Sequence, residues 1–197
     1  GSGMLKKRFL MFAMILPATA FCAAFSLAAM VHAATGTHLM PGKPLPPIQL
    51  PLPDDPAQRA YLGVPENGFF KIAQIQAEFV ILEIMSVFCP ECHKNAPKIN
   101  QLHQVISKDP ELEAGIRLIA VAMGNSRAQA SAYARQYQVA FPVLPVAEAE
   151  IADKLGGVQT PTLLIVGPES EVVYLHEGAV DDIDALLEVV WALYGGN

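Results

Sequence analysis

The sequence has little positive charge, few charged residues of any kind and only three cysteines. Charged residues make up 16% of the 197 positions and hydrophobic residues 52%, which excludes a disordered or fibrous protein. Three of the 13 Lys and Arg residues and none of the 19 Asp and Glu residues precede residue 34, so the part after residue 33 carries a net charge of −9. So acidic a chain is not expected to bind nucleic acid.

The small number of cysteines limits the kinds of site that the chain can hold. Cys22 lies in an apolar run, and we interpret it as an ordinary apolar residue, which leaves Cys89 and Cys92, three positions apart. A structural zinc site needs four ligands, and no second pair follows at ligand spacing, so no metal site is predicted. A disulfide that closes so short a loop would add only about 2 kcal/mol of stability. The pair is therefore predicted to act chemically.

The first 33 residues have the pattern of a tag remnant followed by an export signal or a membrane anchor. Residues 1–3 precede Met4, and basic residues at positions 6–8 precede Phe9 to Val31, a run of 23 residues without a charge. This run is longer than the roughly 7 to 15 apolar residues of a secretory signal and close to the about 20 that span a bilayer. Cleavage after Ala33 and retention as an inner-membrane anchor therefore both stay open. The basic flank places the rest of the chain outside the cytoplasm.

Proline is concentrated in residues 34–56, where it occupies positions 41, 44, 46, 47, 51, 53 and 56. This density excludes a helix and predicts an extended tether that leads into an edge strand. The sequence thus predicts three parts: residues 1–33 as signal or anchor, 34–56 as the tether, and 57–197 as the folded domain.

The folded part begins with a strand that leads into the cysteine pair. Phe79 to Phe88 is apolar and rich in β-branched and aromatic residues, which predicts a central strand buried on both faces. After Cys89 the apolar residues recur at helical spacing, and Pro90 suits a first helical position. The cysteine pair is therefore predicted to open a helix.

Strand-like and helix-like segments alternate through the rest of the chain. Strands are predicted at 116–123, 141–144, 162–166 and 171–176, and helices at 126–137, 148–155 and 181–194. The last two strands flank Gly167-Pro168-Glu169-Ser170 as a hairpin. This alternation predicts a layered α/β fold with a mostly parallel sheet.

The position of the pair at a helix start predicts redox chemistry. Unpaired N–H groups and the helix dipole stabilise a thiolate on Cys89, which makes it the candidate nucleophile. After Cys89 has formed a mixed disulfide with a partner protein, Cys92 lies one turn away and can release the product. The sequence therefore predicts a thiol-disulfide oxidoreductase that needs no cofactor beyond its own dithiol.

A c-type haem protein is an alternative interpretation of the same residues. Cys89-Pro90-Glu91-Cys92-His93 matches the haem attachment motif, and haem is attached in the same exported compartment. Haem attachment does not require the buried strand that precedes this motif, so the alternating pattern favours the redox interpretation. His93 is then predicted to be an exposed residue of the first helical turn.

The order of these segments resembles the TlpA/ResA-like branch of the thioredoxin superfamily from about Pro44 to Leu193. FVILEIMSVFCPEC is similar to the family's strand and redox turn, and IADKLGGVQTPTLLIVGPESEVVYLHEG is similar to its C-terminal half. The resemblance implies a thioredoxin fold: a central mixed sheet flanked by helices, with an N-terminal extension and an inserted βα unit. It also implies that Pro161 is a cis-proline beside Cys89, and that Thr160 can hydrogen-bond an extended substrate strand.

Three departures from the family pattern concern the site. Met85-Ser86-Val87-Phe88 replaces the family's aromatic run, and proline stands first rather than second between the cysteines, which leaves the redox direction open. The third is Glu83, six residues before Cys89, where thioredoxin itself carries a buried acid and close TlpA-like relatives often do not. Glu83 is predicted to be buried behind the pair and to accept the proton of Cys92. The residues predicted to contact substrate are Phe88, Pro90, Glu91, Thr160 and Pro161.

The resemblance further implies a location and a set of partners. The domain would face the periplasm or the extracytoplasmic side of the inner membrane, and would act on exported cysteine-containing proteins. A membrane thiol carrier would supply electrons, and apocytochrome c maturation is one use in the family. Two other interpretations of the same fold are a redox-inactive peptide-binding module and a peroxidase, although a peroxidase would require a proline before Cys89 that this chain lacks.

Overall fold

The computed structural model describes residues 39–195, and the structural statements below refer to these residues. The predicted signal or anchor and Cys22 lie outside the described residues. Of the helices in the described part, none is both long enough and apolar enough to cross a membrane.

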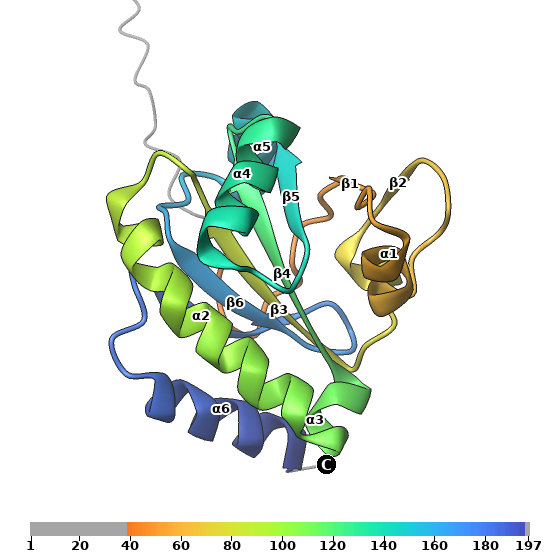
Figure 1. The fold of residues 1–197 in the computed structure, drawn as a ribbon. Helices are drawn as coiled ribbons and strands as arrows, with labels where there is room; N and C mark the ends of the chain where they lie inside the picture. The colour runs from red at the N-terminus through yellow and green to blue at the C-terminus, as the bar shows by residue number, and fades with distance from the viewer. Residues whose placement is uncertain (1–38, 196–197) are drawn as a thin grey trace, which may run out of the picture. The chain divides into compact units, whose positions relative to one another are not determined.

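A five-stranded mixed sheet forms the centre of the fold, with the strand order β5-β4-β3-β6-β7 (Figure 1). Strands β3 (Phe79–Met85), β4 (Ile116–Met123) and β5 (Val143–Val146) are parallel to one another. Strands β6 (Thr162–Val166) and β7 (Val172–Glu177) form an antiparallel hairpin, and β6 pairs antiparallel with β3. The predicted α/β class with a central mixed sheet is confirmed. The two antiparallel pairings correct the expectation of a mostly parallel sheet.

Strand β3 is buried along its whole length because both faces of the sheet are covered. Its even-numbered side chains, Val80, Leu82 and Ile84, belong to one hydrophobic cluster. That cluster also contains side chains of the short helix α1 (Pro56–Leu62), the 3-10 helix η1 (Ile72–Gln74) and α5 (Glu148–Leu155).

The odd-numbered apolar side chains of β3 belong to the hydrophobic cluster on the opposite face. Since neighbouring side chains of a strand point to opposite faces, Glu83 shares this second face with Ile81 and Met85. Helix α2 crosses this face beside α6 (Figure 1). The helices that contribute to this cluster are α2 (Pro90–Lys108), α3 (Pro110–Gly115), α4 (Arg127–Tyr137) and α6 (Ile183–Gly195).

The proline-rich segment belongs to the folded domain from residue 39 onward. Four apolar residues that alternate with its prolines are buried in the first cluster: Leu39, Leu45, Ile48 and Leu50. The short strand β1 (Leu50–Pro51) pairs antiparallel with β2 (Phe69–Phe70). The predicted tether over 34–56 is therefore wrong for residues 39–56, because proline prevents a helix there but does not prevent extended chain from burying apolar side chains.

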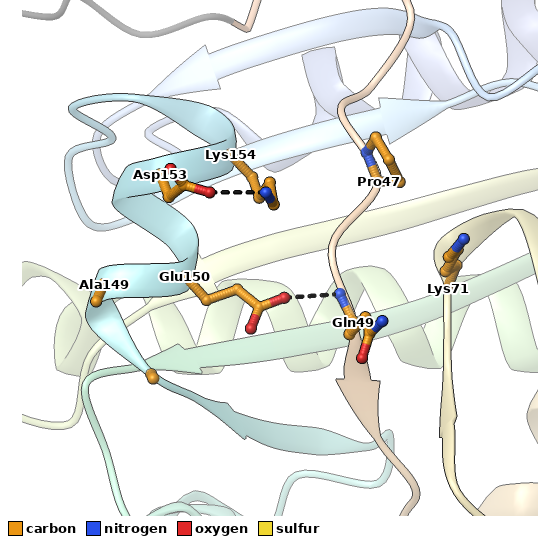
Figure 2. Close-up of a pocket in the computed structure, with 8 residues that line it drawn as sticks. Pro47, Gln49, Lys71, Ala149, Glu150, Asp153 and Lys154 are labelled. Carbon is orange, nitrogen blue, oxygen red and sulfur yellow. Dashed lines mark hydrogen bonds and ion pairs between the residues drawn. The ribbon is translucent and has the colours of Figure 1, made fainter.

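A polar contact also connects this segment to α5. The Gln49 N–H donates to Glu150 Oε1 over 3.1 Å, across the open pocket drawn in Figure 2. On the same helix Lys154 is paired with its neighbour Asp153 at 2.7 Å. The contact sits beside apolar packing, so the segment is held by both kinds of interaction.

Most predicted elements occur close to their predicted bounds. Strand β4, helix α5 and strand β6 have the predicted ends, whereas β5 begins two residues later than expected. Strand β3 ends at Met85 rather than Phe88 because Ser86 and Cys89 close a turn, in which the Cys89 N–H donates to the Ser86 carbonyl over 3.1 Å. The sequence patterns did not predict the short helices α1 and α3.

Candidate active site

Cys89 is the N-cap of helix α2, and Pro90 occupies the first helical position. The Cys89 sulfur accepts a hydrogen bond from the Cys92 N–H at 3.4 Å. Cys89 is partly exposed, whereas Cys92, one turn further along, is fully buried. The three-residue spacing therefore gives the two thiols different environments at the same helix end.

The pKa values of the two thiols move in opposite directions. For Cys89, burial raises the pKa, but hydrogen bonding with the Thr160 and Cys92 side chains and with the Cys92 and Glu91 backbone lowers it by more, so the pKa is lowered overall. Burial is the main cause that raises the pKa of the Cys92 thiol to about 12, and the neighbouring Cys89 adds to it. Of the two thiols, Cys89 therefore ionises more easily, which is the property of an attacking thiol.

The loop before β6 lies directly against the first cysteine. The Thr160–Pro161 peptide bond is cis, and the Cys89 thiol donates to the Thr160 carbonyl over 3.2 Å. Pro161 itself is buried. The loop thus brings a backbone edge to the sulfur.

A cleft of about 410 Å³ opens beside Cys89. Phe88 exposes its apolar ring on this cleft, with 69% of the residue's surface accessible. Glu148, at the start of α5, contributes a carboxylate that the sequence did not single out. The residues that line the cleft are Ser86, Phe88, Cys89, Met123, Gly124, Glu148 and Thr160.

The remaining predicted substrate contacts lie around this cleft rather than in its lining. Pro90 and Glu91 are exposed on the first turn of α2, and Glu91 is paired with Lys94 at 2.6 Å. The structure therefore brings Phe88 and Thr160 to the cleft, and places Pro90, Glu91 and the buried Pro161 beside it.

Glu83 is buried beneath helix α2, with 2% of its surface exposed. Its Oε1 accepts a hydrogen bond from Asn95 Nδ2 at 2.8 Å, which is not enough to offset the loss of water. Burial raises the pKa of Glu83 to about 7, although the Asn95 hydrogen bond lowers it in part. Glu83 in turn contributes to the raised pKa of Cys92. A carboxyl group that titrates near neutral pH therefore lies within electrostatic reach of the buried thiol.

Asn95 is a part of the site that the sequence patterns did not reveal. It is buried one turn after Cys92, and its Oδ1 accepts the Val180 N–H at 2.9 Å while its Nδ2 donates to Glu83. It thereby connects the carboxylate to the loop before α6. Its position three residues after Cys92 on one helix could have indicated it, because residues at this spacing are neighbours on the helix surface.

His93 does not have the predicted exposure. It is half-buried, its Nε2 is 2.8 Å from the Val87 carbonyl oxygen, and its Nδ1 is 2.6 Å from the Tyr137 hydroxyl. With both ring nitrogens engaged inside the fold, this His93 is not presented as an axial ligand, which argues against the haem alternative. Within residues 39–195 no group of three or more His, Cys, Asp and Glu side chains could hold a metal ion.

A dithiol at a helix start, beside a cis-proline loop on a mixed sheet, defines a protein of the thioredoxin fold. The sequence profile of the AhpC/TSA family matches residues 41–175, and the chain belongs to this family.

Curated relatives are named for the activity that the motif predicts. The chain is 24% identical over 113 residues to the thiol-disulfide oxidoreductase ResA of Bacillus subtilis, which covers 57% of this chain and 60% of that protein. It is 20% identical over 127 residues to ResA of Geobacillus thermodenitrificans, covering 64% and 70%. The predicted resemblance to ResA-like proteins is thus confirmed.

Solved structures agree with the fold. A thiol:disulfide interchange protein from a Bacteroides species superposes with a TM-score of 0.60 at 15% identity, over 80% of this chain and 92% of that chain. The thioredoxin domain of a thiol-disulfide oxidoreductase from Bacteroides vulgatus superposes with a TM-score of 0.58 at 14% identity, over 77% and 99%. The predicted thioredoxin fold is therefore confirmed.

Proposed function

We propose that this chain is a protein thiol-disulfide oxidoreductase in which Cys89 is the nucleophile and Cys92 the resolving thiol. One observation carries the proposal: the partly exposed Cys89 has a lowered pKa while the buried Cys92 has a raised one. A structural disulfide would need no such difference. Family membership and the ResA relatives support the same activity.

The reaction needs only the dithiol and one proton acceptor. The Cys89 thiolate attacks a disulfide of the partner protein, which forms a mixed disulfide and releases one partner thiolate. Cys92 then gives its proton to the Glu83 carboxylate, directly or through one water, and attacks the Cys89 sulfur. The partner leaves with both of its sulfurs reduced, and the two electrons have come from the Cys89–Cys92 pair. Oxidation of a partner dithiol follows the same steps in reverse.

The cleft beside Cys89 suits an extended polypeptide. Phe88 offers an exposed apolar ring next to the sulfur, and Thr160 offers backbone groups that can pair with a substrate strand. Pro161, Pro90 and Glu91 form the surroundings in which the partner's cysteine would lie.

We further propose that the domain acts on exported cysteine-containing proteins at the extracytoplasmic face of the membrane. The charge pattern of residues 1–33 and the occurrence of disulfides in exported compartments support this location. A membrane thiol carrier would return electrons to the pair, and maturation of apocytochrome c is one reaction that fits this setting.

Trapping of a partner tests the proposal. A Cys92→Ser variant lacks the resolving thiol and should accumulate the mixed disulfide at Cys89, while a Cys89→Ser variant should trap nothing. If neither variant forms a reducible adduct with disulfide-containing exported proteins, the oxidoreductase proposal fails and the peptide-binding interpretation of the cleft takes its place.

Glu83→Gln tests the proton acceptor separately. This change keeps the size of the side chain and should slow release of the mixed disulfide by about 10- to 100-fold, with little loss of fold. Because only the carboxylate can accept the proton, the unmodified protein should release its partner faster as the pH rises through about 7, whereas the variant should not follow this profile. Equal rates across neutral pH would mean that the proton leaves through solvent.

A further inference from the structure

The four residues Ser86 to Cys89 form the turn that delivers the nucleophile to the helix. Within the turn the Cys89 N–H donates to the Ser86 carbonyl over 3.1 Å, and the Phe88 N–H to Ser86 Oγ over 3.4 Å. These bonds leave the N–H and the carbonyl of Val87 to be satisfied from outside the turn. Side chains bind both the N–H and the carbonyl of Val87.

Two side chains from different parts of the chain hold Val87. Asn125 Oδ1, in the loop before α4, accepts the Val87 N–H at 2.9 Å. His93 Nε2, in the first turn of α2, is 2.8 Å from the Val87 carbonyl oxygen. Asn125 is buried, and its Nδ2 has no hydrogen-bond partner among the described residues. The polar contact of this buried side chain is therefore the one that its Oδ1 makes with the Val87 N–H. We call His93 and Asn125 the Val87 clamp.

The neighbours of His93 determine which ring nitrogen carries the hydrogen. A carbonyl oxygen only accepts, so Nε2 must be the donor to Val87. In the neutral ring Nδ1 is then an acceptor, and it receives the Tyr137 hydroxyl at 2.6 Å. Gln136 Nε2 donates to the Tyr137 oxygen at 3.2 Å, which leaves the hydroxyl hydrogen free for His93. The contacts around the ring are thus mutually consistent with one tautomer.

We propose that His93 and Asn125 are positioning residues that hold the Val87 turn, and through it set the direction of the Cys89 sulfur. This inference deepens the proposed function and rests on it for its importance in turnover. With Val87 held on both sides, the Cys89 sulfur lies 3.2 Å from the Thr160 carbonyl and 3.4 Å from the Cys92 N–H. Loss of the clamp frees the turn, and the thiolate then spends less time aligned with the N–H groups that stabilise it.

The test uses the reduced full chain with Cys92→Ser, and measures the pH at which alkylation of Cys89 is half-maximal. Three variants at one position separate hydrogen bonding from packing. In His93→Gln the amide nitrogen can take the place of Nε2, in His93→Asn it reaches only the level of Nδ1, and His93→Leu has no polar group. We expect the midpoint to rise by about one pH unit in the Leu and Asn variants and to stay near the original value with Gln.

The opposite contact has its own variant. Asn125→Leu keeps the approximate size of the side chain but replaces its polar group, which removes the acceptor for the Val87 N–H. It should shift the midpoint in the same direction as His93→Leu. In chains that retain Cys92, either change should also shift the glutathione redox equilibrium about tenfold toward the disulfide, because a less stabilised thiolate weakens the reduced form.

Several results would overturn the clamp. One is an unchanged midpoint in folded His93→Asn and Asn125→Leu chains; another is a midpoint that rises equally with Gln and Asn, which would assign the effect to the imidazole ring itself. If His93→Leu does not fold, the two polar variants still decide the question. Alkylation requires no protein substrate, so a chain that reduces no protein but shows the expected shifts would refute the proposed function and leave the clamp intact.

Discussion

The burial of Glu83 predicts that the stability of this domain depends on pH in a window set by one side chain. The pKa of Glu83 is about 7 in the folded protein and 4.5 for an ordinary glutamate. Between these values the unfolded chain has lost the proton while the folded protein keeps it. Since the folded state then binds more protons, the free energy of unfolding falls as the pH rises through this window.

The size of the effect follows from the same two values. Each pH unit of difference corresponds to about 1.4 kcal/mol, so the gap between 4.5 and about 7 amounts to about 3 kcal/mol. This contribution is fully present below pH 4.5 and is lost above about pH 7, where both states are ionised. Glu83→Gln has no titrating group at this position and should lack this part of the pH dependence.

Denaturant unfolding from about pH 5 to about pH 8 measures the difference. A Cys89→Ser background removes the Cys89 thiol, whose pKa is lowered, from the titration. Glu188→Gln, at an exposed position of α6, is the matched control and should keep the pH dependence of the parent. If the parent and Glu83→Gln curves stay parallel, Glu83 does not carry a raised pKa, and the proposed proton acceptor loses its physical basis.

Three further predictions test other parts of the structure. Iodoacetamide at neutral pH should label Cys89 at least about tenfold faster than Cys92, and faster labelling of Cys92 would reverse their proposed roles. Tyr133→Phe removes a hydrogen bond of 3.0 Å to the Cys92 carbonyl and should lower the free energy of unfolding by about 1 kcal/mol. Leu50→Ala should cost about 2 to 5 kcal/mol, because Leu50 is fully buried; a loss below about 0.5 kcal/mol would restore the tether interpretation of this segment.

Elements bounded by strong local signals could be predicted from the sequence. The run of β4 lies between Gly115 and Gly124, and α5 is followed by Gly156, so their ends are visible without knowledge of the fold. The site of the cysteine pair could also be predicted, because the strand, the turn and the helix around it follow one another without interruption. In these cases the sequence pattern and the element that it predicts occupy the same few residues.

Contacts between segments that are far apart in the sequence could not be predicted from such local patterns. The Asn95 bond to Val180 spans 85 positions, and the His93 bond to Tyr137 spans 44. His93 therefore looked like an exposed helical residue, because nothing in its neighbourhood showed that α4 would cover it. The packing of residues 39–56 was not predicted for the same reason. The proline density indicated extended chain, and the apolar residues between the prolines contact α1 and α5 only in the folded protein.

The environments of the two cysteines also determine where a base is needed. The pKa of Cys89 is lowered at the helix N-cap, whereas Cys92 has a pKa of about 12 and does not ionise appreciably at neutral pH, so a base is needed most at Cys92. Glu83 contributes to the raised pKa of Cys92 while it is ionised, and this repulsion disappears when the carboxylate takes up the proton. Transfer of the Cys92 proton to Glu83 therefore removes the charge that opposes a thiolate at this place. In the proposed reaction Glu83 acts at the resolving step, and attack by Cys89 depends instead on the turn and the helix end that hold its sulfur.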